Sequence, residues 1–401
     1  MRICIADYSG HPFQVQLSRE LARRGHDLLH LYFSEFQTPK GRLQCEASDP
    51  ATLQIEAISL GRPFAKYELL KRRGQEIEVG VLFTKRIARH RPGIVIACNL
   101  PLDALNAVRK WCVGASCPFI FWQQDIYSRA IEDILTEKFG LLGRMVGRHY
   151  HRLERRAARD SAAVVVIAED FRGILEREFG IAADKIHVIE NWAPLDEIVP
   201  RAKTNPWSVA NGFAECDIVL YTGTLGMKHN PGQILELAKS LQGRNRTRLV
   251  VISEGPAADW LKQSAEKADI STLQVLPFQP FEIYSDVLAS ANVLISILEP
   301  EAGVFSVPSK VLSYLCSARP IVLSAPQENL ASKIINDNAA GLAVPAGDTP
   351  AFIRAVHALL DAPDRAAQCA RNGRSYAERT FDIVSIGDRF EKIISRAVGA
   401  R

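Results

Sequence analysis

Short apolar runs alternate with longer amphipathic stretches along the first half of this chain, and the alternation predicts strands and helices in turn. A strand is expected at 2–9, a helix at 12–24 that ends at Gly25, and a second strand at 26–33. Further strands are expected at 54–60, 93–99, 119–125, 162–168 and 185–191. Apolar strands separated by helices are typical of a parallel sheet covered on both faces. We therefore expect one parallel α/β domain in this half.

The alternation stops over 192–214, where three prolines, Asn205 and Gly212 occur without a helical or strand period, as in a linker. It restarts with strands expected at 217–223, 248–253, 272–278, 293–298, 321–324 and 341–348, a helical region at about 350–378 and an amphipathic helix at 382–398. A chain of 401 residues is also longer than one core usually supports. The sequence therefore predicts an N-terminal domain over 1–192, a linker over 193–214, a C-terminal domain over 215–380, and a final segment, 381–401, that packs back on the N-terminal domain.

The segment 299–326 is the most informative part of the second half. It follows the expected strand at 293–298, turns at Gly303, and starts an amphipathic helix at Pro308-Ser309-Lys310. Such a loop places backbone N–H groups and a lysine beside the carboxyl ends of parallel strands, which suits a phosphate. A phosphorylated small molecule is therefore the first ligand to expect.

Composition narrows the class of protein. The chain is 47% apolar and 23% charged, and it contains no run of about 18 apolar residues that would predict a spanning helix. The N-terminus has no signal-peptide pattern, and the eight cysteines form no CxxC pair, as expected for reduced thiols in the cytoplasm. The net charge of +4 is too small to imply nucleic acid as a partner.

Two segments are locally basic. Residues 62–91 hold nine Lys and Arg against three Glu, and residues 138–159 hold seven against one. In the second segment, arginines alternate with Phe139, Leu141, Leu142, Met145 and Val146. A basic amphipathic helix of this kind can lie on an anionic membrane surface. The alternative is a solvated helix whose apolar stripe packs on its own domain, and both interpretations stay open.

The second half resembles the family-4 retaining glycosyltransferases of the GT-B class. The residues that carry the resemblance, in the family's order and spacing, are ENW (190–192), YTGTLGMKHNP (221–231), SEGP (253–256), LPF (276–278), PSKVLSYLCSARPIVLS (308–324) and GLAVPAGD (341–348). The first half is similar more loosely, through 19–28, 122–128 and 161–175. The branch that it resembles most builds bacterial exopolysaccharide, colanic-acid-like or O-antigen chains.

The resemblance implies a GT-B fold, in which two Rossmann-like parallel-sheet domains face a cleft. It implies a nucleoside-diphosphate sugar, UDP- or GDP-linked, held by the second domain, and a lipid-linked or saccharide acceptor held by the first. Transfer is expected to proceed with retention, in bacterial surface-polysaccharide biosynthesis. No further cofactor is expected, and no metal, since the chain has no Asp-x-Asp motif. Such an enzyme is expected in the cytoplasm, in peripheral contact with the anionic inner face of the cytoplasmic membrane.

The resemblance also assigns residues to the donor site. Lys228 and Lys310 would offset the charge that develops on the leaving diphosphate, and Gly10 would let backbone approach it from the first domain. The full set of expected donor-binding residues is Gly10, Gly223, Thr224, Lys228, Gly255, Pro277, Phe278, Glu301, Gly303, Val304, Phe305, Ser306, Lys310 and Ser313. Surface-loop roles for the two lysines, and a plain turn role for Gly10, are the alternatives.

The chain departs from the family's pattern at two motifs. Where the family often carries Arg-x4-Lys, this chain has Thr224 and His229. Where the family carries Glu-x7-Glu, it has Phe305 and Ser313, and a serine bonds ribose hydroxyls more weakly than a glutamate does. Glu299 and Glu301 lie just upstream and could reach the donor sugar, and a place in a surface turn is the alternative for both. These departures concern the identity of the donor more than the reaction class.

Catalytic residues are expected in the first domain. Asp125 ends the strand 119–125 and could orient the acceptor hydroxyl, or else cap the next helix. His11 follows Gly10 and could contact acceptor or phosphate, as could Asp7, and a plain first-turn role is the alternative for His11. Two other functions share the architecture. One is a nucleotide-sugar epimerase of GT-B fold, and the other is a degraded glycosyltransferase that only binds nucleotide or a partner.

Overall fold

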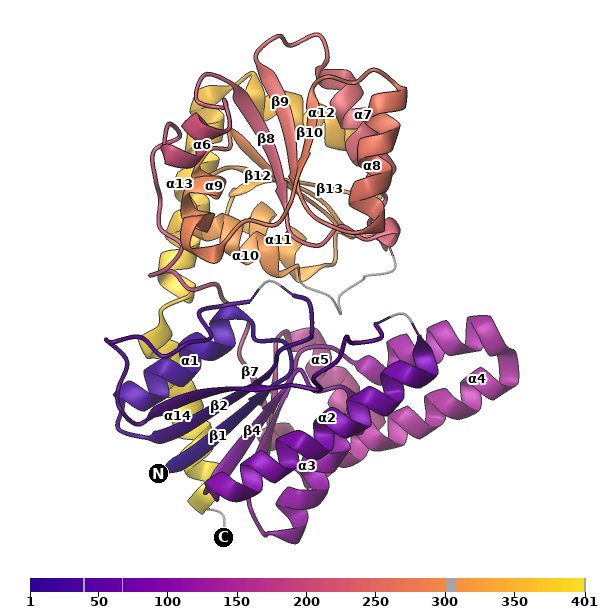
Figure 1. Cartoon of the computed structure of the whole chain (residues 1–401), viewed down its shortest axis with the longest axis vertical. Helices are drawn as coiled ribbons and strands as arrows, with labels where there is room; N and C mark the ends of the chain where they lie inside the picture. The colour runs from indigo at the N-terminus through magenta and orange to yellow at the C-terminus, as the bar shows by residue number, and fades with distance from the viewer. Residues whose placement is uncertain (39, 67, 301–307, 400–401) are drawn as a thin grey trace. The chain divides into compact units, whose positions relative to one another are not determined.

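The computed structural model describes residues 1–38, 40–66, 68–300 and 308–399 of the chain (Figure 1). These residues form two compact units, of which unit 1 comprises Met1–Glu190 with Ile383–Arg401 and unit 2 comprises Asn191–Asp382. Each unit contains one parallel β-sheet with helices packed against it. The α/β class with two parallel-sheet domains, expected from the alternating pattern, is thus confirmed.

The sheet of unit 1 has seven strands in the order β3-β2-β1-β4-β5-β6-β7, all paired in parallel. The strands are β1 (Arg2–Asp7), β2 (Asp27–Phe33), β3 (Leu53–Ile58), β4 (Ile94–Cys98), β5 (Phe119–Gln123), β6 (Ala163–Val166) and β7 (Ile186–Val188). The four central strands are almost wholly buried, which explains their unbroken apolar runs.

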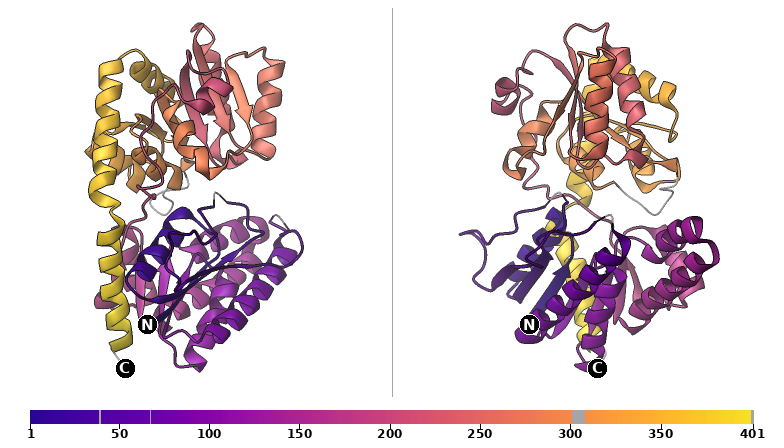
Figure 2. Two further views of the ribbon diagram at one scale, coloured as in Figure 1. Left: turned by 60° about the vertical axis from the view of Figure 1, so that its left-hand side comes forward. Right: turned by 45° about the vertical axis from the view of Figure 1, so that its right-hand side comes forward.

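The helices of unit 1 cover both faces of this sheet. They are α1 (Pro12–Arg23), α2 (Leu69–His90), α3 (Leu102–Gly114), α4 (Tyr127–Asp160), α5 (Glu169–Ile174), the π-helix η1 (Leu175–Phe179), the 3₁₀ turn η2 (Ala183–Lys185) and α14 (Ile383–Gly399). α2 and α3 pack together on one face, and α1 packs with α14 on the other (Figure 2).

Helix α4 is a hairpin of two arms, because Gly140 has non-helical angles, φ 56° and ψ −126°. Glycines bring the arms together: a Cβ on Gly143 would lie 1.8 Å from the carbonyl oxygen of Leu135, and one on Gly147 would lie 2.7 Å from Glu132 Cβ. The arms run side by side in Figures 1 and 2. The single helix expected over 138–159 is wrong at its start, since Gly140 divides it.

The sheet of unit 2 has six parallel strands in the order β10-β9-β8-β11-β12-β13. They are β8 (Asp217–Thr222), β9 (Thr247–Ile252), β10 (Leu273–Leu276), β11 (Val293–Ile297), β12 (Ile321–Ser324) and β13 (Gly341–Val344). Their inward side chains, among them Val219, Leu249 and Val293, form one cluster with helix residues such as Phe352. This core positions the loops that follow β8 and β11.

The helices of unit 2 differ from expectation in two places. They are α6 (Pro206–Ala210), η3 (Met227–His229), α7 (Pro231–Leu241), α8 (Pro256–Lys267), η4 (Phe281–Ile283), α9 (Tyr284–Ala289), α10 (Ser309–Cys316), α11 (Leu330–Asp337), α12 (Thr349–Leu360) and α13 (Pro363–Thr380). The stretch expected as linker contains α6, which Asn205 caps by accepting from Ser208 N at 3.0 Å. The region 350–378 is two helices, because Pro363 starts α13 anew.

The C-terminal helix α14 belongs to unit 1, although the chain reaches it only after unit 2. The ring of Phe390 lies 4.8 Å from that of Trp122 on β5, and both side chains are fully buried. Arg24 binds Asp388 at 2.6 Å and Glu391 at 2.9 Å. An apolar contact and an ion-pair cluster therefore hold α14 in place.

Candidate functional site

The strand order of unit 2 locates a candidate site. From the central strand β8, the chain winds outward through β9 and β10 in one direction and through β11, β12 and β13 in the other. In open parallel sheets, ligands bind outside the carboxyl ends of the strands at such a switch point. The switch point here lies between β8 and β11, so Gly223 and Thr224 after β8 and Glu299 after β11 fall beside it.

Gly223 makes the turn that leaves β8. Its φ is +98°, a conformation that residues with a Cβ rarely adopt, and its N–H donates to the Ile252 carbonyl at 3.0 Å. A Cβ at this position would lie 3.4 Å from Lys310 Cε and 3.7 Å from its Nζ. The Gly223 turn therefore lies directly against the Lys310 side chain.

Lys310, in the first turn of α10, reaches over the end of β8. Its Nζ lies 3.7 Å from the centre of the Tyr221 ring and 3.4 Å from the Thr224 carbonyl oxygen, to which it donates. The Tyr221 hydroxyl donates to the same oxygen at 2.8 Å. Burial lowers the pKa of Lys310 to about 7, and no carboxylate in the described ranges pairs with it. A half-buried amine without a counter-charge is suited to an anionic ligand.

A buried hydroxyl network fixes the end of β8 against α9 and α10. Thr222 N donates to the Tyr314 hydroxyl at 2.9 Å, and Thr222 Oγ1 lies 2.9 Å from the Tyr284 hydroxyl. Burial raises the pKa of Tyr284 to about 12, and a hydrogen bond from Ser313 acts the other way. Ser313, expected to touch the donor, thus contacts Tyr284 in this structure.

The loop after β8 is tied to the loop after β11 by His229. Gly226 N donates to His229 Nδ1 at 2.9 Å, so this ring nitrogen is the acceptor and Nε2 carries the proton of the neutral ring. Nε2 faces Glu299 Oε2 at 3.5 Å. Glu299 therefore lies at the switch point, beside His229.

The next loop outward follows β9. Ser253 Oγ accepts from Leu225 N at 3.1 Å, which joins this loop to the β8 turn. Gly255, with φ +101°, precedes the first turn of α8, and Glu254 Oε1 accepts from Phe278 N at 3.0 Å. The Phe278 side chain is exposed. Gly255, Pro277 and Phe278 thus lie at the carboxyl ends of β9 and β10, at the same edge of the sheet as Gly223.

Several expected residues cannot be placed. Glu301, Gly303, Val304, Phe305 and Ser306 lie outside the described residues, and Lys228 is described only as part of the backbone of η3. No group of three His, Cys, Asp or Glu in the described ranges comes together as metal ligands would.

In unit 1 the corresponding switch point lies between β1 and β4, and the loop after β1 surrounds Asp7. Asp7 Oδ1 accepts from Ser9 N at 2.8 Å, and Oδ2 accepts from Gly10 N at 2.9 Å. Burial raises the pKa of Asp7 to about 7, against the effect of these N–H donors. Gly10 has φ +71°. Asp7 therefore holds the loop from within and is too buried to touch acceptor directly.

His11 and Asp125 lie at helix starts of unit 1. His11 precedes α1 and its ring stacks on Phe13 with the centroids 5.8 Å apart. Asp125 is half-buried in the bend between β5 and α4. Ile126 is the N-cap of α4, and its own side chain makes no cap bond. At the start of α4, Glu154 Oε1 accepts from Tyr127 N and Glu154 Oε2 accepts from Ser128 N, both at 3.0 Å.

Sequence reasoning missed the Tyr221 ring and Glu154. Tyr221 sits inside an apolar strand, where an aromatic residue usually indicates core, and only the position of Lys310 gives it a second role. Glu154 lies among basic residues of α4, and only the hairpin brings it to the start of its own helix.

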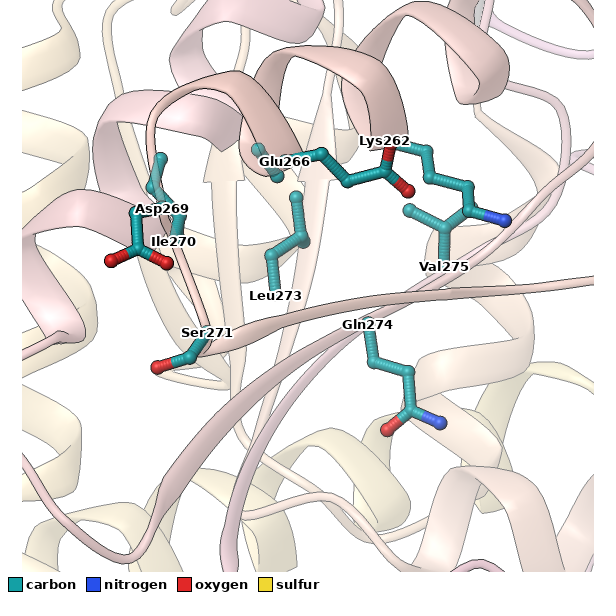
Figure 3. A pocket seen from close by; sticks show the side chains of 9 residues that line it. Lys262, Glu266, Asp269, Ile270, Ser271, Leu273, Gln274 and Val275 are labelled. Carbon is teal, nitrogen blue, oxygen red and sulfur yellow. The ribbon is translucent and has the colours of Figure 1, made fainter.

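Unit 2 also has a shallow hollow along the C-terminal half of α8 and the edge strand β10 (Figure 3). Lys262, Glu266 and Gln274 line it. It lies away from Gly255 at the other end of α8, so it is separate from the switch point.

Comparison with known proteins agrees with the two-unit division. Residues 13–197 match the family described as Glycosyltransferase Family 4, and residues 207–376 match Glycosyl transferases group 1. Among curated proteins, an alpha-D-kanosaminyltransferase of Streptomyces kanamyceticus is 25% identical over 248 residues. That match covers 60% of this chain and 62% of the relative, so it spans less than two thirds of the relative's length.

Three solved structures match over all or nearly all of the chain. Anabaena Alr3699/HepE in complex with UDP-glucose has a TM-score of 0.70 at 15% identity, covering 98% of this chain and 99% of that one. Sucrose-phosphate synthase of Thermosynechococcus elongatus has a TM-score of 0.72 at 14% identity, with 100% of both chains covered. WaaG, a glycosyltransferase involved in lipopolysaccharide biosynthesis, has a TM-score of 0.69 at 16% identity, covering 98% and 99%. At these identities the likeness establishes the fold, which is GT-B.

Proposed function

Because the chain carries a Glycosyltransferase Family 4 domain followed by a Glycosyl transferases group 1 domain, we propose that it transfers a sugar from a nucleoside-diphosphate sugar to an acceptor. The observation that carries the proposal is the half-buried Lys310 amine at the switch point of unit 2, beside the Gly223 turn. Among the described residues it has no carboxylate partner, so a diphosphate would supply the missing negative charge.

In the proposed reaction, negative charge develops on the leaving diphosphate as the bond to the anomeric carbon breaks. The protonated Lys310 amine stabilises this charge best when it is already in position, because no reorganisation is then needed. Its position is fixed by Tyr221 and by the Thr224 carbonyl. We assign Gly223, Thr224, Gly255, Pro277, Phe278 and Ser313 to the surrounding donor site, together with Glu299, which faces His229.

A uridine diphosphate sugar is the donor we favour. HepE has been crystallised with UDP, with UDP-glucose, and with UDP and glucose, and its fold matches nearly the whole of this chain. A GDP-linked donor remains the second choice. We further propose that transfer proceeds with retention and without a metal ion, as the family resemblance implies.

We propose that the acceptor is a lipid-linked or saccharide molecule of bacterial surface-polysaccharide biosynthesis and that unit 1 binds it. Asp125 is the residue we assign to orienting the acceptor hydroxyl, and His11, which follows the Gly10 turn, to contacting acceptor or phosphate. Asp7 positions this loop through its bonds to Ser9 N and Gly10 N. The match to WaaG, which acts in lipopolysaccharide biosynthesis, supports an acceptor of this class.

The test is a panel of UDP-, GDP- and dTDP-sugars, with release of free nucleoside diphosphate followed in the presence and absence of bacterial lipid extract. Release that requires both one donor and an acceptor supports the proposal. An isomerised nucleotide sugar formed without acceptor would identify an epimerase instead. Thermal stabilisation by nucleotide with no turnover under any condition would leave only a binding module.

A further inference from the structure

The tip of the α4 hairpin exposes an unusual number of apolar side chains. Phe139, Leu141, Leu142 and Met145 are 55%, 79%, 71% and 64% exposed. Ile134 and Val146, on the same tip, are also exposed. Elsewhere in the described ranges, large exposed apolar residues occur singly or in smaller groups. A cluster of this kind on a folded unit marks a surface that contacts another molecule.

The construction of the hairpin explains why these side chains point outward. Gly143 and Gly147 place the second arm against Leu135 and Glu132 of the first, so no larger side chain fits between the arms there. Both glycines are buried, whereas their neighbours Leu142, Met145 and Val146 face solvent. The apolar face therefore does not lie between the two arms of the hairpin, and it does not pack on the rest of unit 1.

The base of the hairpin is anchored to unit 1, and the tip is not. Tyr150 donates to Asp103 at 2.9 Å, Arg155 donates to the Phe179 carbonyl at 3.2 Å, and the His151 ring contacts that of Phe179 at 5.1 Å. Within the described chain, no side chain of residues 130–149 makes a hydrogen bond or an ion pair. The first arm, at about 1.5 Å per residue, carries the tip roughly 20 Å from this base.

Basic side chains border the apolar cluster. Arg144, Arg148, Arg152 and Arg156 recur at every fourth residue of the second arm and are all exposed, and Lys138 lies beside the bend. Like charges at this spacing repel one another, and a negatively charged surface would relieve the repulsion. The Arg73 guanidinium of α2 lies 6.0 Å from the centre of the Tyr150 ring on the second arm. This contact joins the hairpin to the helix that contains the other basic segment.

We propose that the hairpin tip docks on an anionic lipid bilayer. Phe139, Leu141 and Leu142 enter the boundary between headgroups and acyl chains, while Arg144 and Arg148 contact lipid phosphates. No helix of the described residues is long and apolar enough to cross a membrane. Docking would bring unit 1 to a lipid-linked acceptor, and this purpose of the contact rests on the proposed function.

The test is co-sedimentation of the full-length protein with vesicles of phosphatidylcholine alone or mixed with phosphatidylglycerol, without any donor sugar. We expect binding to the mixed vesicles that weakens as salt rises. L141E/L142E should lower it at least tenfold. R144E/R148E should lower it by more than tenfold, since each basic residue near such a surface contributes about a fivefold factor, or ~1 kcal/mol. Lys110→Glu and Val113→Glu change exposed residues of α3 and should leave binding unchanged.

Light scattering tests whether the hairpin tip contacts a second copy of the chain instead of a bilayer. A wild-type dimer that L141E/L142E converts to monomer would overturn the proposal and assign the tip to a second copy of the chain. Vesicle binding that both hairpin variants retain would also overturn it. Thermal stabilisation by UDP, measured on the same variants, reports unit 2 separately, so a failed donor assignment cannot be mistaken for a failed hairpin assignment.

Discussion

The amine of Lys310 lies 3.7 Å from the centre of the Tyr221 ring, at the switch point of the second sheet. The ring face favours the protonated amine, and burial disfavours it. Burial is the larger effect, since the pKa of Lys310 falls to about 7. The amine is thus close to half protonated at neutral pH and ready to gain a proton when an anion arrives.

Replacing Lys310 should damage donor use while leaving the fold intact. We expect Lys310→Met to lower turnover at least tenfold, on the scale of one lost contact to developing charge. Lys262→Met is the matched control, because Lys262 is exposed on α8 in the same unit and borders the separate hollow. Steady-state kinetics on both variants make the comparison. Equal activity of Lys310→Met and wild type would remove Lys310 from the site.

Donor affinity should depend on pH through the same amine. Binding of a diphosphate favours protonated Lys310, whose pKa in the free protein is about 7. Affinity for a nucleotide sugar, whose diphosphate keeps its charge, should therefore fall as pH rises above about 7. Calorimetry at pH 8 in buffers of different ionisation enthalpy should show proton uptake on binding. Lys310→Met should bind weakly at every pH, and uptake that persists in this variant would contradict the assignment.

Gly223→Ala tests the turn that lies against this lysine. Alanine at φ +98° is strained by about 1–3 kcal/mol, and its Cβ would lie in ordinary van der Waals contact with Lys310 Cε at 3.4 Å. We expect weaker nucleotide binding together with a lower melting temperature. Gly243→Ala is the control, since φ is not positive there and no atom lies within 4 Å of the added Cβ. A variant at 223 that binds nucleotide normally would mean that the turn lies away from the donor.

The sequence predicted the elements of both sheets because buried parallel strands are apolar throughout and short. Five of the six residues of β1 and all five of β11 are buried, and both strands stand out from the amphipathic helices around them. The place of Lys310 in the first turn of a helix after such a strand was predictable for the same reason, and its role in binding phosphate stays a prediction.

The hairpin and the contacts of the site were not predictable in the same way. Gly140 interrupts a helical period that continues on both sides of it, so only its backbone angles reveal the bend. The sequence separation between Glu154 and Tyr127, or between Ser313 and Tyr284, gives no sign that these side chains meet. Such contacts depend on tertiary packing, which no local period encodes.

Glu154 should stabilise the start of the hairpin. It is fully buried and accepts from Gln123 Nε2, Tyr127 N and Ser128 N, each at 3.0 Å. Glu154→Ala leaves these donors without a partner, and we expect a loss of about 2–4 kcal/mol in the free energy of unfolding. Unfolding in denaturant measures this loss. Glu137→Ala, at an exposed position of the same hairpin, should change stability by less than about 0.5 kcal/mol.

Glu154 should also make stability depend on pH. Burial raises its pKa in the folded protein from 4.5 to about 7, so the folded state binds the proton more tightly than the unfolded state does. The contribution of Glu154 to the free energy of unfolding is fully present below about pH 4.5 and is lost as pH rises through about 7. The melting temperature of wild type relative to Glu154→Gln should therefore fall between pH 5 and pH 8. A difference that rises over this range would contradict the direction of the shift.

Helix α14 should be required for the stability of unit 1. Phe390 packs on Trp122 and is fully buried, so Phe390→Ala should cost about 3–5 kcal/mol. Val384→Ala, at a position that is 53% exposed on the same helix, is the control. Denaturant unfolding followed by circular dichroism makes the comparison. Equal stability of the two variants would mean that α14 does not hold unit 1 together.

A crystal structure with UDP-glucose tests most directly whether unit 2 has a nucleotide-sugar site at its switch point. We predict that the diphosphate lies beside the Gly223 turn with an oxygen within hydrogen-bond distance of Lys310 Nζ. A diphosphate bound elsewhere, for example in the hollow between α8 and β10, with Lys310 still on the Tyr221 ring and without an anionic partner, would contradict the account.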